Sequence, residues 1–213
     1  MRATPHCPNC HFPLFAHPFD AKAAPTPAPV FPESHIMIGN NVLGDPHALI
    51  TVAEQSDAWR PSAIAEGDGA RYGAGRSNDF LFVCGDAEAR FAPFETALTA
   101  AFHGAASSYS AMLGHLSLRS DLGYQLLRYR PGEEFTEHVD ILPGATVYGQ
   151  RLVSAIAYLN DDYDGGELRF PRQGFTYNPL AGSLILFPSN FCYPHASLPV
   201  RRGIKYAVVT WFI

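Results

Sequence analysis

The second half of the chain alternates short apolar runs with glycine- and proline-rich turns, a pattern typical of antiparallel β proteins. The last of these runs is apolar on both faces and therefore predicts a buried strand. The spacing of the runs favours a sandwich or barrel over alternating β-α units. The predicted strands are Gly123–Arg130, Arg151–Asn160, Glu167–Phe170, Gly182–Phe187 and Lys205–Ile213.

The first half of the chain contains two stretches with helical periodicity. In Asn40–Trp59, Asp45 is placed to cap a helix and Pro46 to occupy its first turn. Phe91–Leu113 is rich in alanine, with large apolar residues three to four positions apart. We expect both helices to pack their apolar faces against the sheet.

Histidine and aspartate residues, which commonly bind metal ions, lie between the predicted strands. His138 and Asp140, in F-T-E-H-V-D, are two positions apart, so an extended segment points both side chains to one side. His195 follows in F-C-Y-P-H-A-S. Two imidazoles and one carboxylate leave three metal positions open, which is the geometry of non-haem iron(II) oxygenases. Alone, H-x-D is weak evidence, because Asp140 could be a turn residue and His138 a surface or core histidine.

A lysine stands at the head of the last predicted strand. The period of two places Lys205 on one strand face with Ala207, Val209 and Trp211. Burying an unpaired ammonium group lowers the free energy of unfolding by roughly several kcal/mol. Lys205 therefore either extends to water at the strand end or faces a carboxylate that is not part of the protein.

Three stretches of the chain resemble the 2-oxoglutarate- and iron(II)-dependent oxygenases, specifically their prolyl 4-hydroxylase-like branch. They are Y-Q-L-L-R-Y-R-P-G before H-V-D, Y-L-N-D-D-Y-D-G-G-E-L-R-F-P, and H-A-S-L-P-V-R-R-G-I-K-Y-A-V-V-T-W. The match covers about 90 residues in register and includes the step from His195 to Lys205. It implies a mostly β fold with flanking α: a double-stranded β-helix (jelly roll) core with N-terminal bracing helices.

The resemblance implies that His138, Asp140 and His195 bind iron(II) and form the catalytic centre. The implied enzyme is an oxidoreductase, a dioxygenase that uses O2 to decarboxylate 2-oxoglutarate to succinate and to hydroxylate an aliphatic C–H bond, with ascorbate as a candidate reductant. Neutral imidazole and carboxylate suit iron(II) and leave room for a bidentate 2-oxo acid. Aspartate at position 140 disfavours the related halogenases, in which a small residue stands there.

Four further site residues are carried over from the same resemblance. Lys205 would pair with the distal carboxylate of 2-oxoglutarate, and the hydroxyl of Tyr129 would contact that carboxylate as well. Trp211 would line the co-substrate pocket. Arg151 matches an arginine near the substrate in the prolyl hydroxylases, although an arginine at a strand start is often only solvated.

The substrate is left open by these residues. Peptidyl proline, a free amino acid and a small metabolite are all compatible with the site, because loops and pocket shape determine the substrate. Two alternatives share the fold: a non-oxygenase cupin-like metal protein, or a 2-oxoglutarate-binding sensor. Lys205 together with Tyr129 weighs against a bare metal site, and the complete ligand set weighs against a degenerate binding module.

Composition limits the choice of partners. The chain has 213 residues and a formal net charge of −5 without a basic block, which disfavours nucleic acid as a partner. No apolar run is long enough to span a bilayer and no export signal is visible, so we expect a cytoplasmic protein without a membrane partner. A peptide or small molecule is the expected substrate partner, and the sequence does not indicate an oligomeric state.

We expect two regions along the chain. Residues 1–33 form a Pro/Ala-rich N-terminal tail with a C-x-x-C motif. Residues 34–213 form a single oxygenase domain, with helical support at 40–115 and the jelly-roll core at 120–213.

The cysteines divide into a pair and two single residues. Cys7 and Cys10 in C-P-N-C-H could be free thiols, a tight disulfide, part of a zinc site or, in an exported protein, a haem attachment site. Cys84 and Cys192 are isolated in sequence and predict buried, small apolar side chains.

Overall fold

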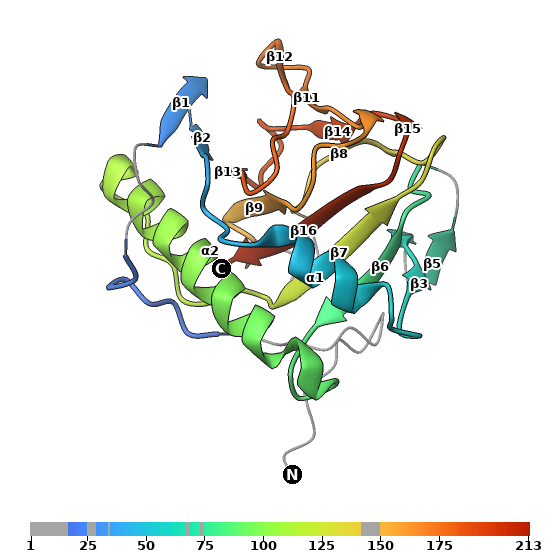
Figure 1. The fold of residues 1–213 in the computed structure, drawn as a ribbon. Coiled ribbons are helices and arrows are strands. Elements are labelled where there is room, and N and C mark those ends of the chain that lie inside the picture. The colour runs from blue at the N-terminus through green and yellow to red at the C-terminus, as the bar shows by residue number, and fades with distance from the viewer. Residues whose placement is uncertain (1–16, 25–28, 34, 67–68, 73–74, 142–149) are drawn as a thin grey trace.

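The computed structural model describes residues 17–24, 29–33, 35–66, 69–72, 75–141 and 150–213. The C-x-x-C motif at Cys7 and Cys10 and the loop at 142–149 lie outside the described residues. The described part contains two main antiparallel sheets that pack together, two further strand pairs and two α-helices (Figure 1).

The large sheet has eight strands, all antiparallel to their neighbours. Their order is β1 (Val30–Glu33), β2 (Ile36–Gly39), β13 (Leu184–Pro188), β9 (Val153–Tyr158), β16 (Lys205–Phe212), β7 (Tyr124–Tyr129), β6 (Asp79–Val83) and β3 (Arg60–Pro61).

The small sheet has four strands, in the order β12 (Phe175–Tyr177), β11 (Leu168–Phe170), β14 (His195–Ser197) and β8 (Phe135–His138). Two strand pairs lie beside the main sheets: β10 (Asp164–Gly165) with β15 (Val200–Arg202), and β4 (Ala63–Glu66) with β5 (Gly69–Tyr72). From β7 to β16 the chain passes repeatedly between the large and the small sheet, which is the topology of a jelly roll. The predicted jelly-roll core is confirmed.

Both predicted helices are present. Helix α1 (Pro46–Ala53) begins as expected, with the Asp45 side chain accepting a hydrogen bond from the backbone N–H of Ala48 at 3.2 Å. Helix α2 (Ala92–Leu113) follows the short 3-10 helix η1 (Ala89–Phe91). It ends at Gly114, whose φ of 73° is the left-handed conformation in which glycine commonly terminates helices.

The two faces of the large sheet have different partners (Figure 1). In β16, Tyr206, Val208 and Phe212 belong to the apolar cluster that includes residues of both helices. The alternate residues, among them Val209 and Trp211, belong to clusters in the interior of the jelly roll. The predicted alternation along this strand is therefore confirmed, and it separates a helix-facing core from the interior between the sheets.

The region predicted as helical support also contains strands that the sequence pattern did not reveal. The five strands predicted from Gly123 onward correspond to β7, β9, β11, β13 and β16. Between α1 and α2, however, the chain forms β3, β4, β5 and β6, and β6 pairs with β7 along its whole length. The assignment of 40–115 to helical support was therefore incomplete, because these strands are too short to show a clear period.

Part of the predicted tail is attached to the domain. The backbone N–H of Phe19 donates to the carbonyl of Arg119 at 2.8 Å, and the ring of Phe19 lies edge-on to Phe212. His17 hydrogen-bonds to the buried Asp121 through Nδ1 at 2.9 Å. Packed structure thus begins well before residue 34, and the division of the chain at residue 33 stays a prediction.

Two smaller predictions can also be compared with the structure. Cys84 is buried as expected, but Cys192 is exposed. The physical reason is that Cys192 follows the exposed Phe191 in the turn before β14, outside both sheets. Among the helices of the described residues, none combines the length and the apolar character required to cross a membrane.

Candidate active site

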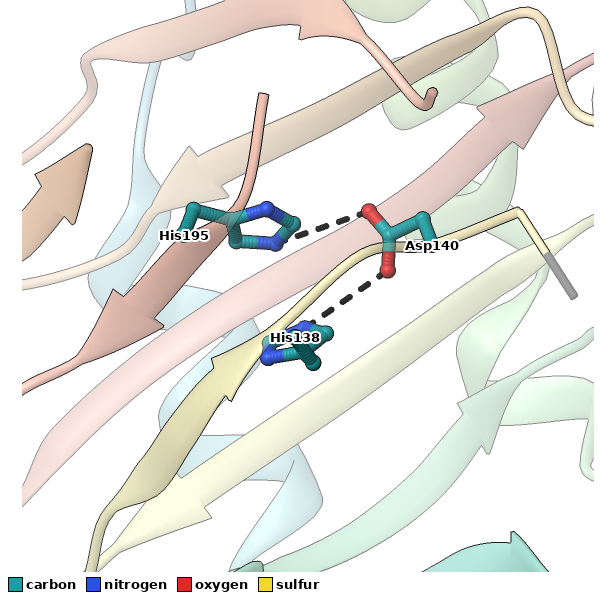
Figure 2. A group of neighbouring side chains, drawn as sticks. All are labelled: His138, Asp140 and His195. Carbon is teal, nitrogen blue, oxygen red and sulfur yellow. Dashed lines mark ion pairs between the residues drawn. The ribbon is translucent and has the colours of Figure 1, made fainter. Parts of the chain in front are cut away.

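The three candidate metal ligands meet at one end of the small sheet (Figure 2). His138 ends β8, His195 begins β14, and the two residues stand directly opposite each other in the strand register. Asp140 follows His138 by two residues; its Oδ1 lies 3.7 Å from Nε2 of His138 and its Oδ2 lies 3.5 Å from Nε2 of His195. Within the described part of the chain this is the one group of at least three such side chains, with ligand atoms within 4.8 Å of one another.

Both imidazole rings are fixed with Nε2 toward the cluster. Nδ1 of His138 lies 2.8 Å from the carbonyl oxygen of Thr136, and Nδ1 of His195 lies 3.2 Å from that of Tyr193. A carbonyl can only accept, so Nδ1 carries the hydrogen in both rings and Nε2 keeps its lone pair for a metal. Phe135 stacks on His138 at 3.5 Å between ring centroids.

The ionisation of the cluster suits a divalent cation. Burial lowers the pKa of His138 to about 3, so this imidazole is neutral at pH 7. Burial alone would raise the pKa of Asp140, but His195, His138, Arg151 and the Ser154 hydroxyl together outweigh it, and the pKa falls to about 2. A neutral imidazole and an ionised carboxylate are the forms that bind iron(II), and the donor set fits that ion.

Lys205 is buried in the interior of the jelly roll, with 2% of its surface exposed. Its Nζ donates to the carbonyl oxygen of Gly166 at 2.6 Å and to Oγ of Ser197 at 2.8 Å. Among the residues that the structure describes, no carboxylate lies within ion-pair distance of Nζ. Burial lowers the pKa of Lys205 to about 7, with a smaller opposing effect of Glu167.

Two tyrosines flank the Lys205 ammonium group. Tyr129 stands directly opposite Lys205 in the register of β7 and β16, and Nζ lies 5.2 Å from its ring centroid. Burial raises the pKa of Tyr129 to about 12, so its hydroxyl is a neutral donor at pH 7. Tyr158 lies at 5.3 Å from Nζ, and its buried hydroxyl has no hydrogen-bond partner within the described structure. The sequence predicted Tyr129 at this position and missed Tyr158.

Arg151 and Trp211 lie together, next to the backbone of Asp140. The Arg151 guanidinium is 3.5 Å from the centroid of the Trp211 ring, and Nη1 donates to the carbonyl oxygen of Asp140 at 3.1 Å. Arg151 is 7% exposed and so is not the solvated arginine that a strand start suggests. The substrate contact of Arg151 and the co-substrate contact of Trp211 stay predictions.

Sequence reasoning missed the hydroxyl side chains around the site. Ser197 contacts Lys205 directly, and Ser154 donates to Oδ2 of Asp140 at 2.5 Å. A signal for Ser154 was available, because it is the one polar residue inside the apolar strand V-S-A-I-A-Y. The period of two also places it on the same strand face as Ile156 and Tyr158, toward the interior.

The C-terminal part of the chain is similar to proteins of one oxygenase superfamily. Residues 124–213 match the 2OG-Fe(II) oxygenase superfamily. A protein of Acanthamoeba polyphaga mimivirus, provisionally named a prolyl 4-hydroxylase, is 31% identical over 104 residues, which cover 41% of this chain and 43% of that protein. The chain spans less than half the length of the first curated relatives that it matches.

Solved structures resemble a larger part of the chain. A prolyl hydroxylase from Trichoplax adhaerens, in complex with a hypoxia inducible factor peptide, has a TM-score of 0.70 at 20% identity, covering 84% of this chain and 83% of that one. A Pseudomonas putida prolyl-4-hydroxylase has a TM-score of 0.61 at 25% identity, covering 84% and 91%. Residues 124–213 therefore resemble the 2OG-Fe(II) oxygenase superfamily, and the similar proteins include several that are named prolyl 4-hydroxylases.

Proposed function

We propose that the protein is an iron(II)- and 2-oxoglutarate-dependent dioxygenase that hydroxylates an aliphatic C–H bond and converts 2-oxoglutarate to succinate. The observation that carries this proposal is the buried Lys205 ammonium group, which has no protein carboxylate within ion-pair distance in the described structure. Such a charge is costly unless an anion compensates it. The distal carboxylate of 2-oxoglutarate would provide that anion.

The position of Lys205 relative to the metal ligands fits a five-carbon diacid. Ser197, which accepts from Nζ, follows His195 by two residues in β14. Residues two apart in a strand point to the same side and are roughly 7 Å apart. A 2-oxo acid chelating the metal at one end would therefore reach Lys205 with its other carboxylate.

The side chains of this chain would bind, orient and shield the reactants. Iron(II), held by His138, Asp140 and His195, would supply the oxidative chemistry. Lys205 and the Tyr129 hydroxyl would fix the far end of the co-substrate, so that the keto acid chelates in one pose. Phe170 and Phe187, both fully buried, lie against His195 and would keep water from that side of the cluster.

As substrate we propose a prolyl residue within a peptide. The support is indirect: several relatives with similar sequence or fold are named prolyl hydroxylases, and the Trichoplax adhaerens structure contains a peptide. A free amino acid or a small metabolite would use the same metal and co-substrate residues. Only the surface outside the cluster would differ between these substrates.

The test is succinate formation from 2-oxoglutarate by protein loaded anaerobically with iron(II) and then exposed to air. Separate reactions receive proline-containing peptides, free amino acids or a metabolite pool, and mass spectrometry detects a gain of one oxygen atom in the substrate. Succinate that rises with the peptides, together with hydroxylated proline, is the expected result. His138→Ala is the control without turnover. Binding of 2-oxoglutarate without succinate from any pool would instead favour a sensor.

A further inference from the structure

We infer that the hydroxyl of Ser154, supported by Ser189, positions the carboxylate of Asp140 as a metal ligand. This inference rests on the proposed metal site and concerns a residue pair outside the three ligands. Ser154 and Ser189 are positioning residues, because they act through Asp140.

The hydroxyl pair has a defined direction. Oγ of Ser154 donates to Oδ2 of Asp140 at 2.5 Å, and Oγ of Ser189 lies 2.8 Å from Oγ of Ser154. Because the one hydrogen of the Ser154 hydroxyl is used on Asp140, the Ser189 hydroxyl must be the donor between the two serines. The result is a chain from Ser189 through Ser154 to the carboxylate, in which each hydrogen bond polarises the next.

Both serines are inaccessible to water, so their hydroxyls must find hydrogen-bond partners within the protein. Ser154 is 0% exposed and Ser189 is 1% exposed. A buried hydroxyl without a partner costs free energy of folding, so the Ser189 hydroxyl needs the contact that Ser154 provides. Since Ser154 occupies Oδ2, the carboxylate is held in one rotation, with Oδ1 on the side of His138 (Figure 2).

The backbone around Asp140 is held by the same elements. Asp140 lies beyond the last residue of β8, so the strand ladder does not fix it. Arg151 donates to the carbonyl oxygen of Asp140 at 3.1 Å, and the N–H of Ile141 donates to the carbonyl oxygen of Ser189 at 3.1 Å. The start of β9 and the end of β13 therefore fix both the backbone and the side chain of this ligand.

The test measures the affinity of the protein for cobalt(II), used as a spectroscopic substitute for iron(II). In the metal-free full-length protein, Ser154→Ala should lower the cobalt(II) affinity about 10- to 100-fold, the usual effect of losing such a supporting contact. The cobalt(II) absorption spectrum should change as well, since the carboxylate can rotate. Ser154→Thr, which keeps the hydroxyl, should restore both the affinity and the spectrum.

A matched control separates positioning from general stability. Ser183 is also buried and lies directly before strand β13 of the large sheet. Its hydroxyl donates to the carbonyl oxygen of Leu180 at 2.6 Å. Ser183→Ala removes a similar hydrogen bond without touching Asp140, so the cobalt(II) affinity should stay unchanged. If Ser154→Ala does not fold, Ser154→Cys fills the same volume with a much weaker donor and should show the same loss.

The possible outcomes distinguish this inference from the proposed function. If the wild-type protein binds cobalt(II) and Ser154→Ala or Ser154→Cys binds it with the same affinity, the positioning role is wrong and the metal site remains supported. No cobalt(II) binding by the unchanged protein would overturn both. A loss in the Ser154 variants, with rescue by threonine and no effect of Ser183→Ala, supports the inference.

Discussion

At the scale of single residues, Lys205 occupies an energetically costly position in the protein without ligand. Its ammonium group is buried between Tyr129 and Tyr158 and relies on two neutral acceptors, the Gly166 carbonyl and the Ser197 hydroxyl. Two neutral hydrogen bonds do not replace the hydration of a full charge. The binding of an anionic co-substrate would compensate this cost, which links the electrostatics of one side chain to the proposed chemistry.

Substitution of Lys205 by alanine tests this link. The change removes a buried, charge-assisted contact, so the free energy of 2-oxoglutarate binding should weaken by roughly 2 to 5 kcal/mol. Calorimetric titration of the anaerobic iron(II)-loaded protein measures the effect. Metal affinity should be retained, because Lys205 is not among the ligands. An unchanged affinity for 2-oxoglutarate would place the co-substrate elsewhere.

The lowered pKa of Lys205 predicts how pH affects co-substrate binding. With a pKa of about 7 in the free protein, the amine loses its charge as the pH rises above 7. A bound carboxylate favours the charged form, so the affinity for 2-oxoglutarate should be constant well below pH 7 and fall above it by up to about tenfold per pH unit. Lys205→Arg, which stays charged, should remove this dependence. A flat pH profile of the unchanged protein would contradict the prediction.

At the scale of elements, strand pairing decides which predicted residues meet. The sequence predicted that His138 and Asp140 point to one side, because they are two apart in one segment. It could not predict from spacing that His195 lies opposite His138, since that depends on the register of β14 against β8. β14 has only three residues and β6 shows no alternation, so neither was visible as a strand. For His195 and Lys205, the resemblance to a family provided what the pattern lacked.

The contact between His17 and Asp121 joins the N-terminal segment to the rest of the domain, and its strength should depend on pH. His17 also lies 3.3 Å from Glu95 of α2, and Asp121 accepts from His103 and Tyr124 as well. The hydrogen bond to Asp121 raises the pKa of His17 despite the opposing effect of burial. The charged form of His17 therefore attaches residues 17–24 to the helix-facing core.

The stability of the protein should follow this pKa. A raised pKa in the folded state means that the contribution of His17 is complete below about pH 6.5 and is lost as the pH rises through the folded pKa. The difference in unfolding free energy between the unchanged protein and His17→Ala should be on the order of 1 kcal/mol at pH 5.5 and smaller at pH 9. Denaturant unfolding at the two pH values measures it. A difference that grows with pH would contradict the assignment.

At the scale of the whole molecule, the large sheet separates the helix-facing apolar core from the candidate site. Its helix-facing side carries an apolar core with α1 and α2, and its other side faces the small sheet and the candidate site. The turn-punctuated apolar runs predicted an antiparallel sandwich or barrel, and the family resemblance specified a jelly roll. Neither of them fixed the boundary of the domain. Composition marks residues 1–33 as a tail, but whether a segment packs depends on contacts distant in sequence, such as that of Phe19 with Phe212.

Two truncations locate the start of the domain. Removing residues 1–16 leaves the contacts of His17 and Phe19 in place, so the stabilisation that these contacts provide should be retained. Removing residues 1–33 deletes those contacts and strand β1, so the melting temperature should fall by about 2–4 °C for each kcal/mol of unfolding free energy that is lost. Equal melting temperatures for the two truncated proteins would support the division at residue 33 that the composition predicts.

The measurement that best tests the combined site is visible absorption during anaerobic addition of 2-oxoglutarate to the iron(II)-loaded protein. Chelation of iron(II) by a 2-oxo acid produces a charge-transfer band, which reports metal and co-substrate together. We predict a saturable band that is absent in Asp140→Ala and needs far more 2-oxoglutarate in Lys205→Ala. No band at concentrations where calorimetry shows 2-oxoglutarate bound would contradict a site in which His138, Asp140, His195 and Lys205 act together.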